Sequence, residues 1–313
     1  MQVVRKIVLF LLLAAALDQT LGALLGVLYE RALTGEVAGV LNNALRQDAE
    51  LLVIGSSRAR HHVDPDVLGA RLHLHGYNAG ANGQDFLYSL MFLDLWRPRH
   101  PAPKLIVMTL DPTTLLHRED EVQGTNVASY YRDQSQIVRE FQDLRGPLER
   151  WKQLSALYRL NGKILPVLKN ALLEDQPIGN GFVGLPGQLQ SAPVTPTDLQ
   201  KERAEAVEPP WDLKMRYLNQ LILHCRAEGT RLVLVHPPRL QPDLSSAELW
   251  HAHIQKLLSP WPEVRFLDYT TPPLQRSLVS DPALFADPAH LNRAGAQIFS
   301  QLLADDLTRT MAQ

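Results

Sequence analysis

Leu51-Leu52-Val53-Ile54-Gly55-Ser56-Ser57-Arg58 is the stretch of sequence that decides the fold. Its first four residues form a continuous apolar run without alternation, which is typical of a parallel strand covered on both faces. A glycine and two serines follow directly, so the strand is expected to end in a turn that leads into a helix. Ligands of open parallel sheets bind beyond the carboxyl ends of the strands, and these serines lie at such an end.

Four further runs of this kind predict an α/β fold with a parallel, five-stranded sheet and helices on both of its faces. The runs are Leu72–His75, Leu105–Leu110, Arg231–Val235 and Val264–Leu267. Apolar residues at helical spacing lie between several of these strands. One such helix is expected to end at Gly229, and the last helix of the chain follows Asn292–Gly295.

The N-terminus predicts a membrane anchor over residues 1–29. Arg5 and Lys6 precede an apolar stretch, Ile7–Tyr29, which at 1.5 Å per residue spans roughly the 30 Å of a bilayer core. Asp18 and Gln19 interrupt the stretch, and an Asp at the bilayer centre costs about 2.5–3.5 kcal/mol. The thirteen Leu, Ile, Phe and Val residues of the stretch offset this with roughly 4–8 kcal/mol.

Two alternatives to a retained anchor remain open. One is a cleaved signal peptide, with its apolar region at Ile7–Leu17 and a small-residue cleavage site at Ala14–Ala16. The other is a buried helix of a soluble protein. The basic residues before the apolar stretch predict a cytoplasmic N-terminus, and hence a single-pass protein whose catalytic domain is extracytoplasmic.

The rest of the chain is expected to hold a helical connector and one large domain. The connector covers residues 30–49, and the domain covers residues 50–313. Residues 118–210 depart from the α/β pattern: helical segments come first, then a long loop rich in Gly, Pro and polar residues. We interpret them as an insertion over one edge of the sheet.

Composition argues against several classes of function. The formal net charge of −2 gives no electrostatic reason to expect a nucleic-acid partner. The chain of 313 residues contains one cysteine, Cys225, so no disulfide within the chain and no Cys-rich metal site is expected. The adjacent His61 and His62 are not at a metal-ligand spacing, and no metal or other cofactor is predicted.

Three short motifs carry groups that together could cleave an ester. Ser57 lies in the turn after the first strand, where its own N–H can point at a developing oxyanion. Asp287 precedes His290 by three residues, so its carboxylate can accept a hydrogen bond from the imidazole Nδ1–H and orient the ring. A glycine-rich block, Tyr77–Gln84, permits the close backbone approach that an oxyanion hole needs. Each motif alone is also common in ordinary turns or helix caps.

The order and placement of these three motifs resemble the SGNH/GDSL hydrolase superfamily, over residues 50–120 and 230–305. The resemblance implies a flavodoxin-like sheet, a nucleophilic Ser57, a base His290 oriented by Asp287, and an oxyanion hole that includes Ser57 and Gly83. The chain is similar above all to a membrane-anchored bacterial subgroup. That subgroup shares the sequences at Gly55–His62, Tyr77–Gln84 and Pro103–Asp111.

One position departs from the family pattern. Family hydrolases usually carry an oxyanion-binding Asn after the third strand, and this chain has Asp111 in Thr109-Leu110-Asp111-Pro112. An ionised carboxylate would repel an oxyanion. Either Asp111 points elsewhere, or Asn82 or Asn78 supplies the third donor. Arg58 and Asp111 are the candidate substrate-binding residues, since Arg suits anionic or polyhydroxylated substrates.

The sequence therefore predicts an esterase, a deacylase or an O-acyltransferase that works on acyl esters of cell-envelope glycans through a Ser57–His290–Asp287 triad. Its expected partners are an acyl ester or carbohydrate substrate and the bacterial cytoplasmic membrane, contacted through residues 7–29. A transferase would also need a membrane partner that donates acyl groups. The alternative is a catalytically inactive module of the same fold that binds glycans or assists envelope polymer assembly.

Overall fold

The computed structural model describes residues 1–118, 125–160, 162–172, 179–190, 203–274 and 277–311. The chain divides into two compact units. The helical unit consists of residues 1–46, 91–98 and 119–177, and the α/β unit consists of residues 47–90, 99–118 and 178–313. Of the predicted insertion, residues 119–124, 161, 173–178 and 191–202 lie outside the described residues.

The α/β unit is built on a parallel, five-stranded sheet with the order β2-β1-β3-β4-β5. This is the strand order of flavodoxin-like folds, and it confirms the predicted fold class. The strands are β1 (Leu51–Ile54), β2 (Gly76–Asn78), β3 (Leu105–Thr109), β4 (Arg231–His236) and β5 (Arg265–Asp268). Four of the five lie where the apolar runs predicted them.

The prediction of a strand at Leu72–His75 is wrong, because these residues end a helix. Helix α4 (Pro65–Leu72) begins with the Asp64 side chain accepting from the Asp66 N–H, and it ends at His73 in the left-handed conformation. Leu72 and Leu74 are apolar because they pack against the core beside the helix. The second strand, β2, therefore begins only at Gly76.

The sheet is buried on both faces, as its unbroken apolar runs predicted. Leu51, Val53, Leu105 and Val107 belong to a core cluster. That cluster also holds residues from α3 (Ser57–His62), α4 and α14 (Arg293–Met311). The alternate strand residues, such as Leu52 and Ile106, point to the opposite face and are equally buried.

The other helices of the α/β unit lie between consecutive strands along the chain. They include the first half of α5 (Phe86–Trp96), α12 (Asp212–Glu228) and α13 (Leu244–Leu258). Short 3-10 turns form at Ser277–Ser280 and Pro282–Leu284. A further 3-10 turn, Arg97–Arg99, lies at the boundary between the two units. Helix α12 ends at Gly229 in the left-handed conformation, as the sequence predicted. The core-facing residues of α14 are Ala296, Phe299, Leu303, Ala304 and Leu307.

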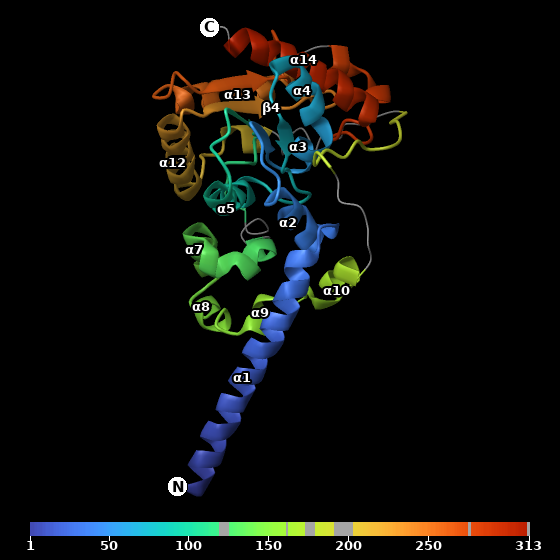
Figure 1. The fold of residues 1–313 in the computed structure, drawn as a ribbon. Helices are drawn as coiled ribbons and strands as arrows, with labels where there is room; N and C mark the ends of the chain where they lie inside the picture. The colour runs from blue at the N-terminus through green and yellow to red at the C-terminus, as the bar shows by residue number, and fades with distance from the viewer. Residues whose placement is uncertain (119–124, 161, 173–178, 191–202, 275–276, 312–313) are drawn as a thin grey trace. The chain divides into compact units, whose positions relative to one another are not determined.

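The helical unit contains α1 (Gln2–Arg31), which is long and apolar enough to cross a membrane. Figure 1 shows the first half of α1 projecting alone, while short helices lie beside its second half. After α1 the chain forms a π-helical turn (Gly35–Gly39) and α2 (Val40–Ala44). The other elements are a 3-10 segment (Thr125–Gln134), α7 (Gln136–Asp143), α8 (Glu149–Lys152), α9 (Ala156–Arg159) and α10 (Ile164–Leu172).

Candidate active site

Ser57 is placed by the tight turn between β1 and α3. Gly55 has a φ of +139°, and a Cβ on it would lie 2.0 Å from Oγ1 of Thr109, so this position requires glycine. Ser56 caps α3, because its hydroxyl accepts from the Arg58 N–H at 3.2 Å. The two serines therefore have different positions and partners, and Ser57 is the one that faces His290.

The loop before α14 brings Asp287 and His290 together. Buried Phe285 and Leu291 pair as an antiparallel bridge, and the Ala286 N–H donates to the His290 carbonyl at 2.9 Å. Within the loop, Oδ1 of Asp287 accepts from the backbone N–H groups of Ala289 (2.8 Å) and His290 (3.0 Å). Asp287 is not the cap of the following helix, since the Asn292 side chain accepts from the Gly295 N–H instead.

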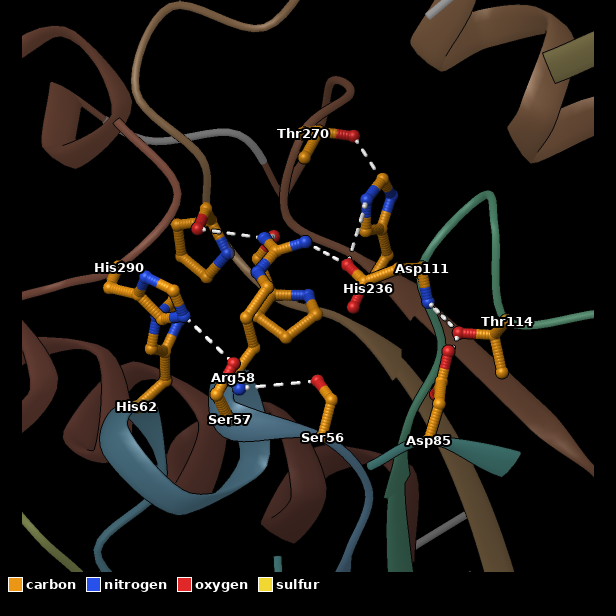
Figure 2. Close-up of polar contacts among 12 residues, drawn as sticks. Ser56, Ser57, Arg58, His62, Asp85, Asp111, Thr114, His236, Thr270 and His290 are labelled. Carbon is orange, nitrogen blue, oxygen red and sulfur yellow. Dashed lines mark hydrogen bonds and ion pairs between the residues drawn. The ribbon is translucent and has the colours of Figure 1, made fainter. Parts of the chain in front are cut away.

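Ser57, His290 and Asp287 form a continuous hydrogen-bonded chain. Oγ of Ser57 lies 2.8 Å from Nε2 of His290, and Nδ1 of His290 lies 2.9 Å from the nearer oxygen of Asp287. Figure 2 shows the contact between Ser57 and His290. Because an ionised carboxylate can only accept, Nδ1 carries the proton and Nε2 is left to accept from Ser57. This is the arrangement of nucleophile, base and orienting acid.

Two backbone N–H groups lie free at the positions predicted for the oxyanion hole. Neither Ser57 nor Gly83 donates its backbone N–H to an acceptor among the residues that the structure describes. Gly83 has a φ of +65°, is exposed, and has no atom within 4 Å of where a Cβ would lie. The backbone at Gly83 is therefore open to a ligand.

Of the two asparagines considered as a third donor, only Asn82 remains available. Asn78 is buried, donates to the carbonyls of Ala59 and Val63 at 2.7 Å, and accepts from the Gly80 N–H. Its amide is thus fully occupied inside the fold. Asn82 is exposed, and its side-chain oxygen lies 2.8 Å from Nε2 of His61.

His61 limits how Asn82 can turn. Both ring nitrogens of His61 face oxygens, the other being the Val183 carbonyl at 2.7 Å, and only a doubly protonated ring donates to both. Burial lowers the pKa of His61, which favours the neutral ring. A neutral ring would donate to Val183 and accept from a rotated Asn82 amide. In either state, at least one N–H of Asn82 remains free of His61.

Arg58 and Asp111, the candidate substrate-binding residues, form an ion pair with each other. Their side chains are 10% and 16% exposed. The same guanidinium donates to the carbonyls of Pro237 (2.5 Å) and Pro238 (3.0 Å). The backbone N–H of Asp111 also donates to Oγ1 of Thr114 at 2.8 Å (Figure 2). The charge of Asp111 is therefore turned toward Arg58.

The ion pair continues into a polar row along the carboxyl ends of the strands. Nε2 of His236, at the end of β4, lies 3.8 Å from Asp111, and its Nδ1 lies 3.1 Å from Asp268 at the end of β5. Asp268 also contacts His251 at 3.1 Å. The sequence analysis did not single out Asp268, although an Asp directly after the apolar pair Phe266-Leu267 was a usable signal.

His62 packs beneath the triad as a neutral, buried histidine. Its Nε2 accepts from the Leu291 N–H at 3.0 Å, and its ring lies edge-on to that of His290 with centroids 6.0 Å apart. Burial, followed by the nearby charge of Arg58, lowers the pKa of His62 well below its ordinary value. Among the described parts of the chain, no group of three or more His, Cys, Asp or Glu residues is arranged to hold a metal.

Residues 179–190, part of the predicted long loop, run along the α/β unit beside this site. The Val183 N–H donates to the Arg60 carbonyl, and the Leu185 carbonyl accepts from Arg293. Gly181 has a φ of +79°, and a Cβ there would meet the carbonyl of Asn78. A cavity of about 410 Å³ lies along this segment, lined by Asp64, Phe182, Val183, Gly184, Arg293 and Gln297.

Comparison with known proteins leaves the family open. No family model matches the chain, and no curated protein matches it. A solved structure from Streptococcus pneumonia that carries the provisional name of a platelet activating factor resembles it weakly. The TM-score is 0.44 and the identity 13%, over 87% of this chain and 92% of that one. The function must therefore be argued from the site.

Proposed function

We propose that the protein is a serine esterase, deacylase or O-acyltransferase of the SGNH/GDSL type, anchored in a bacterial cytoplasmic membrane and acting outside the cytoplasm on acyl esters of cell-envelope glycans. The observation that carries the proposal is the 2.8 Å contact between Ser57 and His290, with Asp287 at 2.9 Å on the other side of the imidazole. A chance meeting of a serine and a histidine would not also supply the carboxylate at the second ring nitrogen.

Acylation begins when Nε2 of His290 takes the hydroxyl proton of Ser57 as Oγ attacks the ester carbonyl. The new Oγ–C bond creates an oxyanion, and the free N–H groups of Ser57 and Gly83 are its first candidate donors. The imidazolium then gives its proton to the leaving alcohol oxygen, and the C–O bond to that alcohol breaks. Asp287 stabilises the imidazolium throughout this step.

Deacylation repeats the same proton transfers with a new acceptor. His290 takes a proton from water or from a sugar hydroxyl, whose oxygen attacks the acyl carbonyl. The bond between the acyl carbon and Oγ of Ser57 then breaks, and the imidazolium returns a proton to Oγ. Water as the acceptor gives an esterase, whereas a sugar hydroxyl gives an O-acyltransferase. A transferase outside the cytoplasm needs an acyl-donating membrane partner, because acyl-coenzyme A is a cytoplasmic donor.

The Arg58–Asp111 pair bears on the alternative of an inactive binding module. The main reason for that alternative was a carboxylate in place of the family Asn, which would oppose an oxyanion. Asp111 instead pairs with Arg58, and the guanidinium compensates its charge. The free N–H of Asn82 then serves as the third donor, and catalysis stays the better supported reading.

The proposal is tested by ester turnover with purified full-length protein in detergent. We expect release of acetate from O-acetylated glycan fragments and from an activated aryl acetate, and loss of both in Ser57→Ala. Ser56→Ala is the matched control, because Ser56 caps α3 and does not contact His290. Adding a deacylated glycan as acceptor separates the two reactions: a transferase moves the acetyl group onto it, whereas an esterase releases acetate at an unchanged rate. Turnover that survives in Ser57→Ala contradicts the proposal.

A further inference from the structure

An interaction surface in the helical unit is not used by the proposed catalysis. Helix α1 is exposed along its first half and packs against other residues along its second half. Its first half, residues 2–17, is exposed all round, whereas Gly22, Gly26 and Tyr29 farther along are buried at helical spacing. A Cβ on Gly22 would lie 2.2 Å from the Cβ of Ala156, so α9 touches the backbone of α1 directly.

Asp18 and Gln19, the polar residues that interrupt the anchor, belong to this docked region. The Asp18 carboxylate accepts from the Ser155 hydroxyl (2.6 Å) and from the backbone N–H groups of Ala156 (2.8 Å) and Leu157 (3.3 Å). The Gln19 amide donates to the Leu154 carbonyl at 3.1 Å. The polar pair is thus hydrogen-bonded to the turn at Leu154–Leu157 and to α9. Neither side chain has to lie unpaired in lipid.

The membrane depth of this turn follows from helix geometry. Roughly 20 residues of helix span the 30 Å core of a bilayer, and Arg5 marks the cytoplasmic edge. The outer edge then falls near Leu25. Asp18 lies seven residues before it, which at 1.5 Å per residue is about 10 Å inside the outer leaflet. The turn bonded to Asp18 must lie near the same depth.

The residues around this turn have the chemistry of a membrane interface. Three apolar side chains stand 57–69% exposed within residues 144–160: Leu148, Trp151 and Leu154. The same segment carries four Lys and Arg against one Glu, and Arg150 and Lys152 are exposed, whereas the whole chain has a net charge of −2. Exposed leucines and a tryptophan with basic neighbours are typical of helices that lie in the headgroup and acyl boundary, at a depth of about 5–10 Å.

We infer that residues 144–160 form a collar beside α1 that is seated in the outer leaflet of the membrane, with Leu148, Trp151 and Leu154 in contact with acyl chains and Arg150 and Lys152 at anionic headgroups. The occupant of this exposed apolar surface is lipid because the surface is continuous with α1, which itself lies in the bilayer. The hydrogen bonds that Asp18 accepts hold the collar against α1. This inference rests on the membrane anchoring proposed above and not on the proposed catalysis.

Site-directed spin labelling of the full-length protein tests the collar. The single cysteine, buried Cys225, is replaced by alanine, and one nitroxide is then attached at Leu154→Cys or Trp151→Cys. The control is Leu249→Cys, a leucine of helix α13 in the α/β unit that is 49% exposed, against 57% for Leu154. The proteins are placed in nanodiscs of phosphatidylethanolamine and phosphatidylglycerol. Collision rates with oxygen, which concentrates in lipid, and with a polar nickel chelate, which stays in water, are then compared.

We expect the ratio of oxygen to nickel collisions to be several-fold higher at residues 151 and 154 than at residue 249. A ratio at residue 154 equal to that at residue 249 would place the collar in water and overturn the inference. Low collision rates with both reagents would also overturn it, because they would mean that a protein partner covers the surface. In an Asp18→Ala protein that keeps its circular dichroism, the residue 154 signal should lose its lipid character, whereas Thr20→Ala should leave it unchanged.

Discussion

The Arg58 guanidinium donates to the Asp111 carboxylate across the carboxyl ends of β1 and β3, in a setting where both side chains are largely buried. Removing one partner of a buried ion pair leaves an uncompensated charge and typically costs about 3–5 kcal/mol. We expect Asp111→Asn, although it restores the family residue, to lower the free energy of unfolding. Arg58→Met with Asp111→Asn should lose less than the two single changes together. Denaturant unfolding of the four proteins in detergent measures this coupling, and strictly additive losses would show that the pair does not matter.

The charge on Asp287 is predicted to matter for the rate and little for the fold. Asp287→Asn keeps a side-chain oxygen that can accept from Ala289 and His290, so the loop should persist. The imidazole loses its carboxylate, however, and acylation should slow by roughly 10²–10⁴-fold. The lower end is favoured because the Asp287 side chain is 51% exposed. Stopped-flow acylation kinetics measure the change, and a rate within twofold of the wild type would remove Asp287 from the triad.

Asn82 is predicted to donate to the oxyanion from its free amide N–H. Loss of one such donor typically lowers turnover by about 10²–10³-fold, so Asn82→Ala should fall in that range with little change in KM. Asn82→Asp should be slower still, because a carboxylate there opposes the developing negative charge. If Asn82→Asp is as fast as Asn82→Ala, the side chain does not face the oxyanion. His61→Gln should have a smaller effect of the same kind, since His61 positions Asn82.

Two glycines are predicted to tolerate alanine differently. Gly55→Ala places a Cβ 2.0 Å from Thr109 at a φ of +139°, whereas Gly83→Ala meets no atom within 4 Å. Strain from such backbone conformations is of order 1–3 kcal/mol, and only Gly55 adds a clash to it. We expect Gly55→Ala to lower the melting temperature more than Gly83→Ala and to abolish turnover. Equal losses of stability would contradict the tight turn described for Gly55.

Stability should fall as the pH is lowered below about 6.5. Burial depresses the folded-state pKa values of His61, His62 and His236, so the unfolded chain binds these protons first as the pH falls. The stability they contribute is present above the ordinary histidine pKa and is lost as the pH falls toward the folded values, at about 1.4 kcal/mol per pH unit for each proton. His62→Gln, which can still accept from Leu291, should flatten the dependence of melting temperature on pH between 7 and 5. An unchanged slope would mean that His62 does not contribute.

The sequence predicted structure correctly where a single local pattern had a single physical cause. The run Leu51–Ile54 is a strand because every residue in it is buried, and Asp287-x-x-His290 closes on itself within one loop. The strand predicted at Leu72–His75 was wrong because leucines that pack against the core beside a helix end resemble a short strand in sequence. The Arg58–Asp111 pair could not be anticipated, since its partners are 53 residues apart and meet only through the pairing of β1 with β3.

The central claim, that Ser57 is an activated nucleophile, is tested most directly by covalent labelling. Full-length protein in detergent is treated with a fluorophosphonate, which reacts with serines that a neighbouring base activates, and the modified residue is mapped by mass spectrometry. We predict a label on Ser57 alone, its loss in His290→Ala, and its retention in Ser56→Ala. A folded protein that takes no label, or one labelled at Ser56, would contradict the account.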